Sequence, residues 1–425
     1  MPVFVGAGTS AFMKGDGGVG YTRLTTTQRN ALTAVEGQVI YNSTTNVLEY
    51  YNGSSWKKVA PVIAKLTGVT GNVADGIATT LTLAGEGFLT SGLVVNFIQS
   101  ADSINVDVSV TPSSDTAATV TIPSSVYSNV TAGRVVSIKV TNSDGSTSGI
   151  QTKTAVAVPT GGTITAYSGY RSHKFTSSGT FTSTALVSQV DALMVAGGGG
   201  GGGDNSGGGG AGGMVVHTGI NVSAQGYSIV IGGGGSGATQ SSGDGGPYAT
   251  NGSNTTAFGY TATGGGRGGS AGGANPNSGG SGGGGAGEAA TGNGASGTSG
   301  QGHDGGNEAA GGGGGGGGKG AVGQNGNVRA STRGGLGGAG AQNNYETGSN
   351  QWYAAGGNGG NENGVYDNPG GTNSIGGISN TTSSNRATNG ATNTGSGGGG
   401  GTHSTTASPA GGDGGSGIVV IRYAV

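Results

Sequence analysis

The chain has 425 residues, a formal net charge of −2 and only 8% charged residues, so it offers no basic surface for nucleic acid. It contains no cysteine, which excludes disulfides and makes oligomerisation the expected source of extra stability. No stretch approaches the about 18 consecutive apolar residues of a membrane span. The first residues, Met1–Gly6, lack the basic start of a secretion signal. The length predicts about two to four domains.

Residues 1–60 are predicted to form a small β-meander with one short helix. Thr25 can cap a helix that runs to Leu32, and strand patterns separated by turns follow at 38–42, 47–51 and 56–59. A unit of this size buries little surface, so we expect it to pack against copies of itself or a larger body. The run Gly37–Trp56, which ends in Tyr-Asn-Gly-Ser-Ser-Trp, resembles a module of fibre and appendage proteins of tailed bacteriophages. There the module lies on the virion-attached side.

Between residues 61 and 158, apolar and polar residues alternate in short runs, at 80–83, 104–110, 118–122 and 136–140. Turn clusters separate the runs, and this pattern predicts an all-β sandwich. The stretch Leu81–Phe88, with two glycines before the aromatic ring, and the stretch Val136–Gly145 resemble the IPT/TIG immunoglobulin-like family. The resemblance implies a spacer or adhesion module, which does not by itself fix a function.

Long glycine tracts follow, at Gly197–Gly203, Gly207–Gly210, Gly311–Gly318 and Gly397–Gly401. Aliphatic strand patterns close the region at both ends, at Asp191–Ala196 and Ile418–Val425. Because a strand needs a sheet to join, we expect these two strands to pair and the glycine between them to be ordered. Glycine reaches an extended helix with about three residues per turn, whose amides must bond to neighbouring chains. We therefore predict packed polyglycine-II helices; the alternative is a flexible linker.

Residues 159–425 resemble the glycine-rich domain at the carboxyl end of phage tail proteins and of some bacterial surface proteins. The matching runs begin at Phe175, Leu193, Tyr227 and Ser416. The resemblance implies a β-sandwich, with strands at 173–196, 213–231 and 418–424, from which the glycine tracts emerge. In related tip adhesins of T-even-like phages, glycine-rich motifs stack as polyglycine-II helices and the loops between them touch the host receptor. The tracts of this chain are longer and less segmented.

No catalytic, cofactor-binding or metal site is predicted, and we expect a protein that is not an enzyme. The run Gly313–Lys319 nearly completes a phosphate-binding loop, but Gly320 stands where Ser or Thr is needed and no strand precedes it. Gly279–Gly283 fits a nucleophile elbow only because glycine is abundant. The four histidines lack metal-ligand spacing. A glycan hydrolase would need two loop carboxylates about 5–10 Å apart.

Side chains suited to recognition concentrate in residues 343–355 and 361–368. Aromatic rings occur there with amides and carboxylates, a composition typical of sugar- and protein-binding loops. The candidate receptor-binding residues are Tyr345, Gln351, Trp352, Tyr353, Asn361, Tyr366 and Asp367. The alternative is that the rings fill gaps against the sandwich. A lesser candidate holds Tyr248, Phe258 and Tyr260.

The patterns predict an all-β protein. The resemblances imply a virion structural protein, a phage tail fibre or external appendage that binds the host cell surface through its glycine-rich distal domain. Residues 1–60 are expected to be the virion-attachment and oligomerisation module, 61–158 an immunoglobulin-like spacer and 159–425 a glycine-rich distal domain. We expect a homotrimer without cofactors, nucleic acid or membrane insertion. Its partners would be tail, baseplate or collar proteins and a host cell-surface glycan or protein. The alternatives are a head, neck or collar fibre or decoration protein without specific receptor binding, and a bacterial surface adhesin.

Overall fold

Nearly all regular structure in this protein is β-strand, as the alternating patterns predicted. The structure is a computed structural model and describes residues 11–13, 19–59, 63–90, 92–239, 248–287, 292–309, 311–326, 334–361, 373, 375–379, 386–403 and 410–425. The chain divides into two compact units, one made of Met1–Gly71, Thr80–Thr121 and Val136–Lys153, the other of Asn72–Thr79, Ile122–Val135 and Thr154–Val425. None of the helices that it describes is long and apolar enough to cross a membrane.

The amino-terminal region forms a five-stranded sheet in the order β1-β2-β3-β4-β5. Its strands are β1 (Ala11–Met13), β2 (Val19–Leu24), β3 (Val39–Asn42), β4 (Val47–Tyr51) and β5 (Trp56–Lys58). The predicted meander corresponds to β3, β4 and β5, whereas β1 and β2 were not predicted. The predicted helix is α1 (Thr26–Asn30), and Thr25 and Gln28 form a reciprocal capping box at its start.

Two further sheets bury alternate residues and form what we call the β6–β12 sandwich. One sheet has the order β10-β7-β6 and the other β12-β11-β8-β9. The strands are β6 (Lys65–Thr70), β7 (Thr80–Glu86), β8 (Leu93–Gln99), β9 (Ile104–Val110), β10 (Ala117–Thr121), β11 (Val135–Asn142) and β12 (Gln151–Thr154). Short helical turns lie at Ser100–Asp102 (η1) and Ser124–Tyr127 (α2). Gly85 cannot carry a side chain, because a Cβ there would overlap the Phe88 ring and the Lys65 carbonyl.

A second pair of sheets, which we call the carboxyl-terminal sandwich, lies within residues 163–424. The larger sheet has the order β13-β14-β23-β16-β17 and the smaller one β15-β18-β19-β20. The strands are β13 (Thr163–Tyr167), β14 (Tyr170–Phe175), β15 (Gly179–Thr182), β16 (Gln189–Val195), β17 (Met214–Asn221), β18 (Gly226–Val230), β19 (Thr255–Ala257), β20 (Tyr260–Ala262) and β23 (Ile418–Ala424). β23 pairs with β16 from Asp191↔Arg422 to Val195↔Ile418, which confirms the predicted pairing of the closing strands.

The central strands β16 and β23 are buried on both faces. One face packs with Phe175, Phe181 and Ile229 in the space between the two sheets. The other face, which includes Leu193 and Val420, packs against the short hairpin formed by β21 (Ala341–Asn343) and β22 (Gln351–Tyr353). This burial explains why both closing segments read as continuous aliphatic runs rather than alternating ones.

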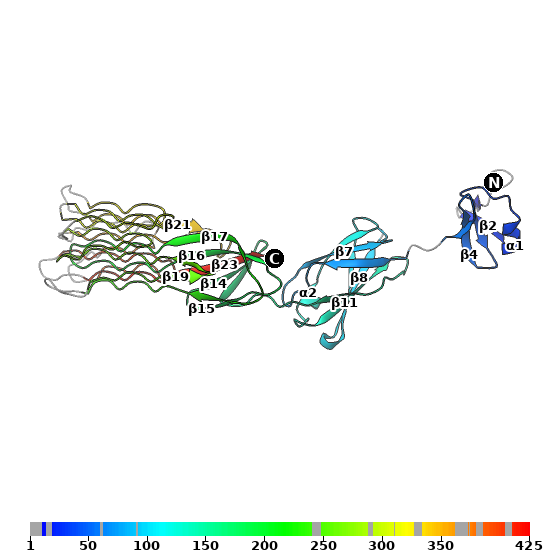
Figure 1. The fold of residues 1–425 in the computed structure, drawn as a ribbon, viewed down its shortest axis with the longest axis horizontal. Coiled ribbons are helices and arrows are strands. Elements are labelled where there is room, and N and C mark those ends of the chain that lie inside the picture. Colours follow the sequence, from blue (N-terminus) through cyan, green and yellow to red (C-terminus); the bar gives the residue numbers. More distant parts are fainter. Residues whose placement is uncertain are drawn as a thin grey trace. The chain divides into compact units, whose positions relative to one another are not determined.

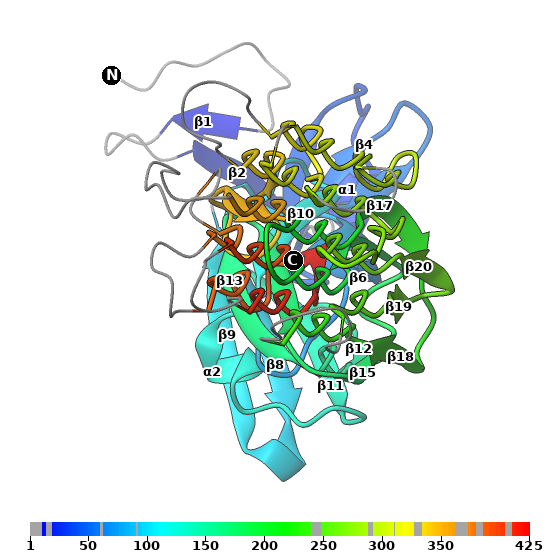
Figure 2. The same cartoon turned by 90° about the vertical axis from the view of Figure 1, so that its left-hand side faces the viewer.

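Beyond the strands, the glycine-rich segments run side by side as an ordered array, which we call the glycine bundle (Figure 1; Figure 2 views the segments nearly end-on). In Gly197–Gly202 the amides of residues 197, 198 and 199 donate to the carbonyls of Ser253, Gly415 and Gly210, at 2.8–3.1 Å. The next three amides return to the same three neighbours, at Thr250, Gly412 and Gly207. This three-residue repeat is the periodicity expected of polyglycine-II helices.

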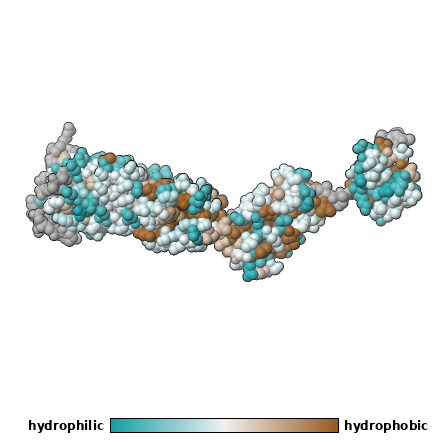
Figure 3. Space-filling view, viewed as in Figure 1, coloured by the Kyte–Doolittle hydropathy of each residue, from teal (hydrophilic) through white to brown (hydrophobic). Residues whose placement is uncertain are grey.

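Three more segments donate to the carbonyls of the same tract. The amides of Gly265, Gly235 and Gly398 bond to Gly197, Gly198 and Gly199, so three accepting and three donating neighbours make six around one tract. A Cβ on any residue of Gly197–Gly202 would overlap a backbone carbonyl of a neighbour. The pure glycine composition of this tract is therefore a packing requirement. Figure 3 shows hydrophobic residues gathered over the strands and a paler, more hydrophilic surface over the glycine bundle.

Candidate functional site

The β21–β22 hairpin carries most of the predicted recognition residues that the structure describes. Its register pairs Gln342 with Trp352 and Ala341 with Tyr353. Neighbouring residues of a strand point to opposite faces, so Trp352 is directed outward and is 38% exposed, whereas Tyr353 is directed inward and is 2% exposed. The hairpin thus separates two rings that are adjacent in the sequence.

Tyr345 and Tyr353 are core residues. Both are buried against Leu193, Ile418 and Val420 of the central strands. For these two rings the structure corresponds to the alternative of filling the core. Burial, and then the charge of Glu346, raise the pKa of Tyr353, so its phenol stays protonated and can donate a hydrogen bond.

An arginine fixes the hairpin to the larger sheet. The guanidinium carbon of Arg422 lies 3.7 Å from the ring centroid of Tyr345 and 4.5 Å from that of Tyr170, a cation–π stack on two rings. Its Nε also donates to Asp191 Oδ2 at 3.1 Å. Burial alone would lower the pKa of Arg422, but hydrogen bonds with Asp191 and Tyr167 raise it overall, so the stack keeps its charge.

Glu346 forms a second anchor at the base of the hairpin. Its Oε1 accepts from Lys174 Nζ at 2.7 Å and its Oε2 accepts from the Tyr353 hydroxyl at 2.9 Å. Its backbone carbonyl accepts from Ser172 Oγ at 2.9 Å. Because β14 supplies both Lys174 and Ser172, the turn that leads into β22 is fixed in position before any ligand arrives.

A hollow of about 210 Å³ lies beside the exposed ring. It is lined by Lys174, Thr176, Glu346, Gln351, Trp352, Tyr353, Thr392, Asn393, Thr394 and Ile418. Ligand pockets usually span about 300–1,000 Å³, so this hollow suits one polar group of a larger ligand that lies across the Trp352 ring. Its hydroxyl, amide and ion-pair groups offer both donors and acceptors. Lys174 and Asn393 were not predicted, because they come from distant segments that only the fold brings together, whereas Glu346 lies within the predicted segment 343–355 but was not among its candidate residues.

The other candidate residues lie elsewhere. Asn361 is buried in the glycine bundle, where its carbonyl accepts from the His403 amide at 2.8 Å. Tyr366 and Asp367 lie outside the described residues. Of the lesser candidates, Tyr248 is exposed, whereas Phe258 and Tyr260 lie together on the β19–β20 hairpin.

The described residues contain no group of three or more His, Cys, Asp or Glu side chains that could hold a metal ion. The phosphate-loop-like run also has a structural role. Every amide from Gly313 to Lys319 donates to a backbone carbonyl, that of Gly318 to Ala321 in the following turn and the others to neighbouring segments. Burial lowers the pKa of Lys319, and its Nζ donates to the Gly300 carbonyl at 2.5 Å. Since its amides are engaged, this run cannot cradle a phosphate.

Two family models match the sequence. The glycine-rich domain model matches residues 176–424, and the model of the phage tail like trimerisation region matches residues 11–74. Among solved structures, the chain is similar to the FN1-FN3 domains of chicken CNTN1, with 13% identity over 44% of this chain and 67% of that chain and a TM-score of 0.18. A TM-score this low does not establish a shared fold. No curated protein matches the sequence.

Proposed function

This chain belongs to the glycine-rich domain family, and from this premise we propose that it is a host-binding appendage of a phage virion. The two family matches indicate a structural protein of phage tail or fibre type, built from domains that are not enzyme families. The trimerisation region supports a homotrimer and a virion component. The proposal adds that residues 159–425 form the distal domain of an external appendage and contact the host cell surface.

The observation that carries this proposal is the exposed ring of Trp352 at the rim of the polar hollow. Aromatic residues with large, rigid faces contribute most of the binding energy at many interfaces. The hairpin is fixed by the Arg422 stack and the Glu346 anchors, so little freedom is lost when a ligand binds. Trp352 and Gln351 therefore remain the candidate contact residues of the predicted set.

The glycine bundle contributes a rigid scaffold of polyglycine-II type in this proposal. Its segments are cross-linked by backbone hydrogen bonds, in three directions around the tract Gly197–Gly202, so the array resists bending without a hydrophobic core. Residues 1–60 would attach and trimerise the protein against tail, baseplate or collar proteins, and residues 61–158 would act as an immunoglobulin-like spacer. Three copies of a weak site on one trimer bind a cell surface with avidity well above that of a single site.

The test is adsorption of the purified trimer to host cells. We expect Trp352→Ala to weaken adsorption by about tenfold or more, since an aromatic hot spot contributes about 2 kcal/mol or more and about 1.4 kcal/mol corresponds to a factor of ten. The melting temperature should stay unchanged, because the ring is partly exposed. The matched control is Val322→Ala, which shortens an exposed apolar side chain of the same domain and should adsorb normally. Normal adsorption by Trp352→Ala would contradict the proposal.

The second candidate is a head, neck or collar fibre without specific receptor binding. The burial of Tyr345 and Tyr353 favours it, because two of the predicted contact rings serve the core. Labelled antibody against residues 159–425, applied to intact particles, separates the two candidates. Label at the tail tip supports host binding, whereas label on the head or collar supports the second candidate.

A further inference from the structure

A larger pocket opens at the mouth between the two sheets of the carboxyl-terminal sandwich. Its volume is about 560 Å³, within the range of about 300–1,000 Å³ that holds small ligands. The walls come from the end of β17, the start of β18 and the β19–β20 hairpin. None of these segments lines the Trp352 hollow, so the pocket is a separate site and does not rest on the host-binding proposal.

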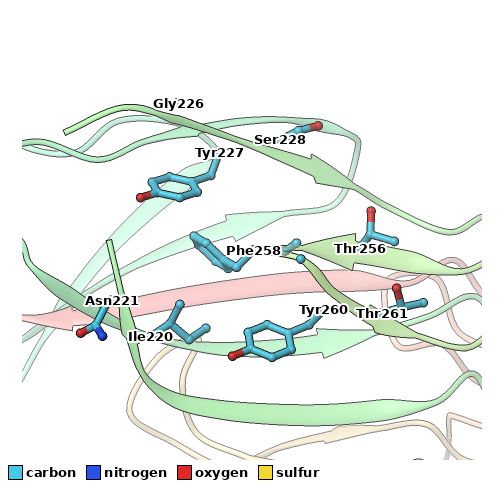
Figure 4. A pocket seen from close by; sticks show the side chains of 11 residues that line it. Ile220, Asn221, Gly226, Tyr227, Ser228, Thr256, Phe258, Tyr260 and Thr261 are labelled. Carbon is cyan, nitrogen blue, oxygen red and sulfur yellow. The ribbon is translucent and has the colours of Figure 1, made fainter. Parts of the chain in front are cut away.

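Three aromatic rings define the pocket. Figure 4 shows Phe258 between Tyr227 and Tyr260, and the ring centroids of Phe258 and Tyr227 are 5.1 Å apart. Phe258 also packs edge-on against Phe181 of the core at 6.2 Å, which leaves it half-buried. All three side chains line the pocket.

The position of Phe258 is not explained by turn chemistry. Phe258 and Gly259 have φ angles of 53° and 81°, so both central residues of this two-residue hairpin are left-handed. Asn-Gly is the usual pair in such a turn, and a bulky residue in this conformation is an outlier that costs about 1–3 kcal/mol. Strain of this kind gathers at functional sites, and here it places an aromatic ring in the pocket.

The two flanking rings are held in place before any ligand binds. Tyr260 is 40% exposed and stacks on His217 with the centroids 3.7 Å apart. The Tyr227 hydroxyl accepts hydrogen bonds from the Ser223 amide at 2.8 Å and from Gln225 Nε2 at 3.1 Å. Because both rings are positioned, a ligand would lose little free energy in ordering them.

The remaining lining determines the class of ligand. It carries no charged side chain, and Asn221, Ser228, Thr256 and Thr261 provide uncharged donors and acceptors. A sugar ring has an apolar C–H face that stacks on aromatic rings and an edge of hydroxyls that hydrogen-bond to such groups. An anionic ligand would find no cation here to replace its hydration. We propose that this mouth binds a neutral saccharide unit.

The test uses the full-length trimer on a printed array of neutral hexose and N-acetylhexosamine oligosaccharides, with sialylated and uronic-acid oligosaccharides as charged probes. We expect retention of neutral probes and not of charged ones. Tyr260→Ala should weaken binding by about tenfold or more. Val322→Ala, which shortens an exposed apolar side chain outside the pocket, should bind normally. Absence of binding by the wild type, or equal binding by Tyr260→Ala, overturns the proposal.

A second variant separates a loss of binding from a loss of folding. Phe258→Asn installs the residue that the turn prefers, so the melting temperature should change little while array binding is lost. If Phe258→Asn binds like the wild type, the saccharide assignment is wrong. If Tyr260→Ala loses the trimer, as measured by sedimentation, the mouth is a subunit interface, and this result would also overturn the saccharide proposal. Trp352→Ala should keep its array binding, so this test and the adsorption test can fail separately.

Discussion

The β6–β12 sandwich and the glycine bundle pair the N–H and C=O groups of their backbones in opposite ways. In the sandwich, hydrogen bonds run within each sheet, and buried side chains such as Leu83 and Phe97 fill the space beside it. In the bundle, the tract Gly197–Gly202 donates hydrogen bonds in three directions and accepts them from three more, and a Cβ on any of its residues would overlap a neighbouring carbonyl. Order in the first region depends on side chains, whereas order in the second depends on their absence.

The largest effect is expected from removal of β23, which lies between β14 and β16 and contributes to both core clusters. Deleting Ile418–Val425 should unfold residues 159–425 and leave residues 61–158 folded. Limited proteolysis with mass spectrometry would show a resistant fragment from the β6–β12 sandwich alone. Native protease resistance of residues 159–425 in the truncated chain would contradict the expectation.

The addition of a single methyl group tests whether the glycine bundle is packed as tightly as the structure shows. Gly315→Ala places a Cβ against the Leu336 carbonyl and must separate two segments, which should destabilise the domain by about 1–3 kcal/mol or more. Gly233→Ala is the matched control, because a Cβ there meets nothing within 4 Å. It should be neutral or slightly stabilising, by up to about 1 kcal/mol. Thermal melts of the two variants test this expectation. If the melting temperature of Gly315→Ala equals that of the wild type, the glycine-rich region is a flexible linker.

The smallest expected effect is a pH dependence confined to the carboxyl-terminal sandwich. Burial lowers the pKa of His173 below its ordinary value of 6.5, against a hydrogen bond to the Gly161 carbonyl, which lies 2.7 Å from Nδ1. Just below pH 6.5, His173 therefore binds a proton in the unfolded chain but stays neutral in the folded chain. Stability is complete above that pH and falls as the pH decreases toward the lowered value, by at most about 1.4 kcal/mol per pH unit.

Urea unfolding at pH 7.5 and 5.5 would measure this loss. His173→Gln should lose less stability than the wild type between the two conditions, because the neutral amide does not titrate in that range. The β6–β12 sandwich contains no histidine and provides an internal reference. An equal loss in the variant would place the acid sensitivity in another group.

Much of the fold could be predicted from the sequence. The pairing of β16 with β23 followed from two unmatched aliphatic runs, and the capped helix followed from Thr25. β8 was missed because Leu93–Gln99 is largely apolar and does not alternate, which period-two patterns cannot detect. The three-residue strands β21 and β22 are too short to give any period.

The candidate site was harder to predict than the fold. Composition marked the aromatic segment 343–355 but could not tell which rings face outward, and the hairpin directs Trp352 and Tyr353 to opposite sides. The Lys174–Glu346 pair joins residues 172 positions apart. The pocket residue Tyr227 appeared only as part of a strand pattern, since its proximity to Phe258 depends on how the two sheets end.

The packing of the glycine bundle also has a thermal consequence. Unfolding exposes apolar surface, which raises the heat capacity, and polar surface, which lowers it, by about 0.45 and 0.26 cal/K/mol per Å² respectively. The bundle buries mainly peptide groups, so its heat-capacity change per residue should be well below that of the β6–β12 sandwich. A small change flattens the curve of stability against temperature. The glycine-rich part of the molecule should therefore keep nearly constant stability from cold to warm surroundings.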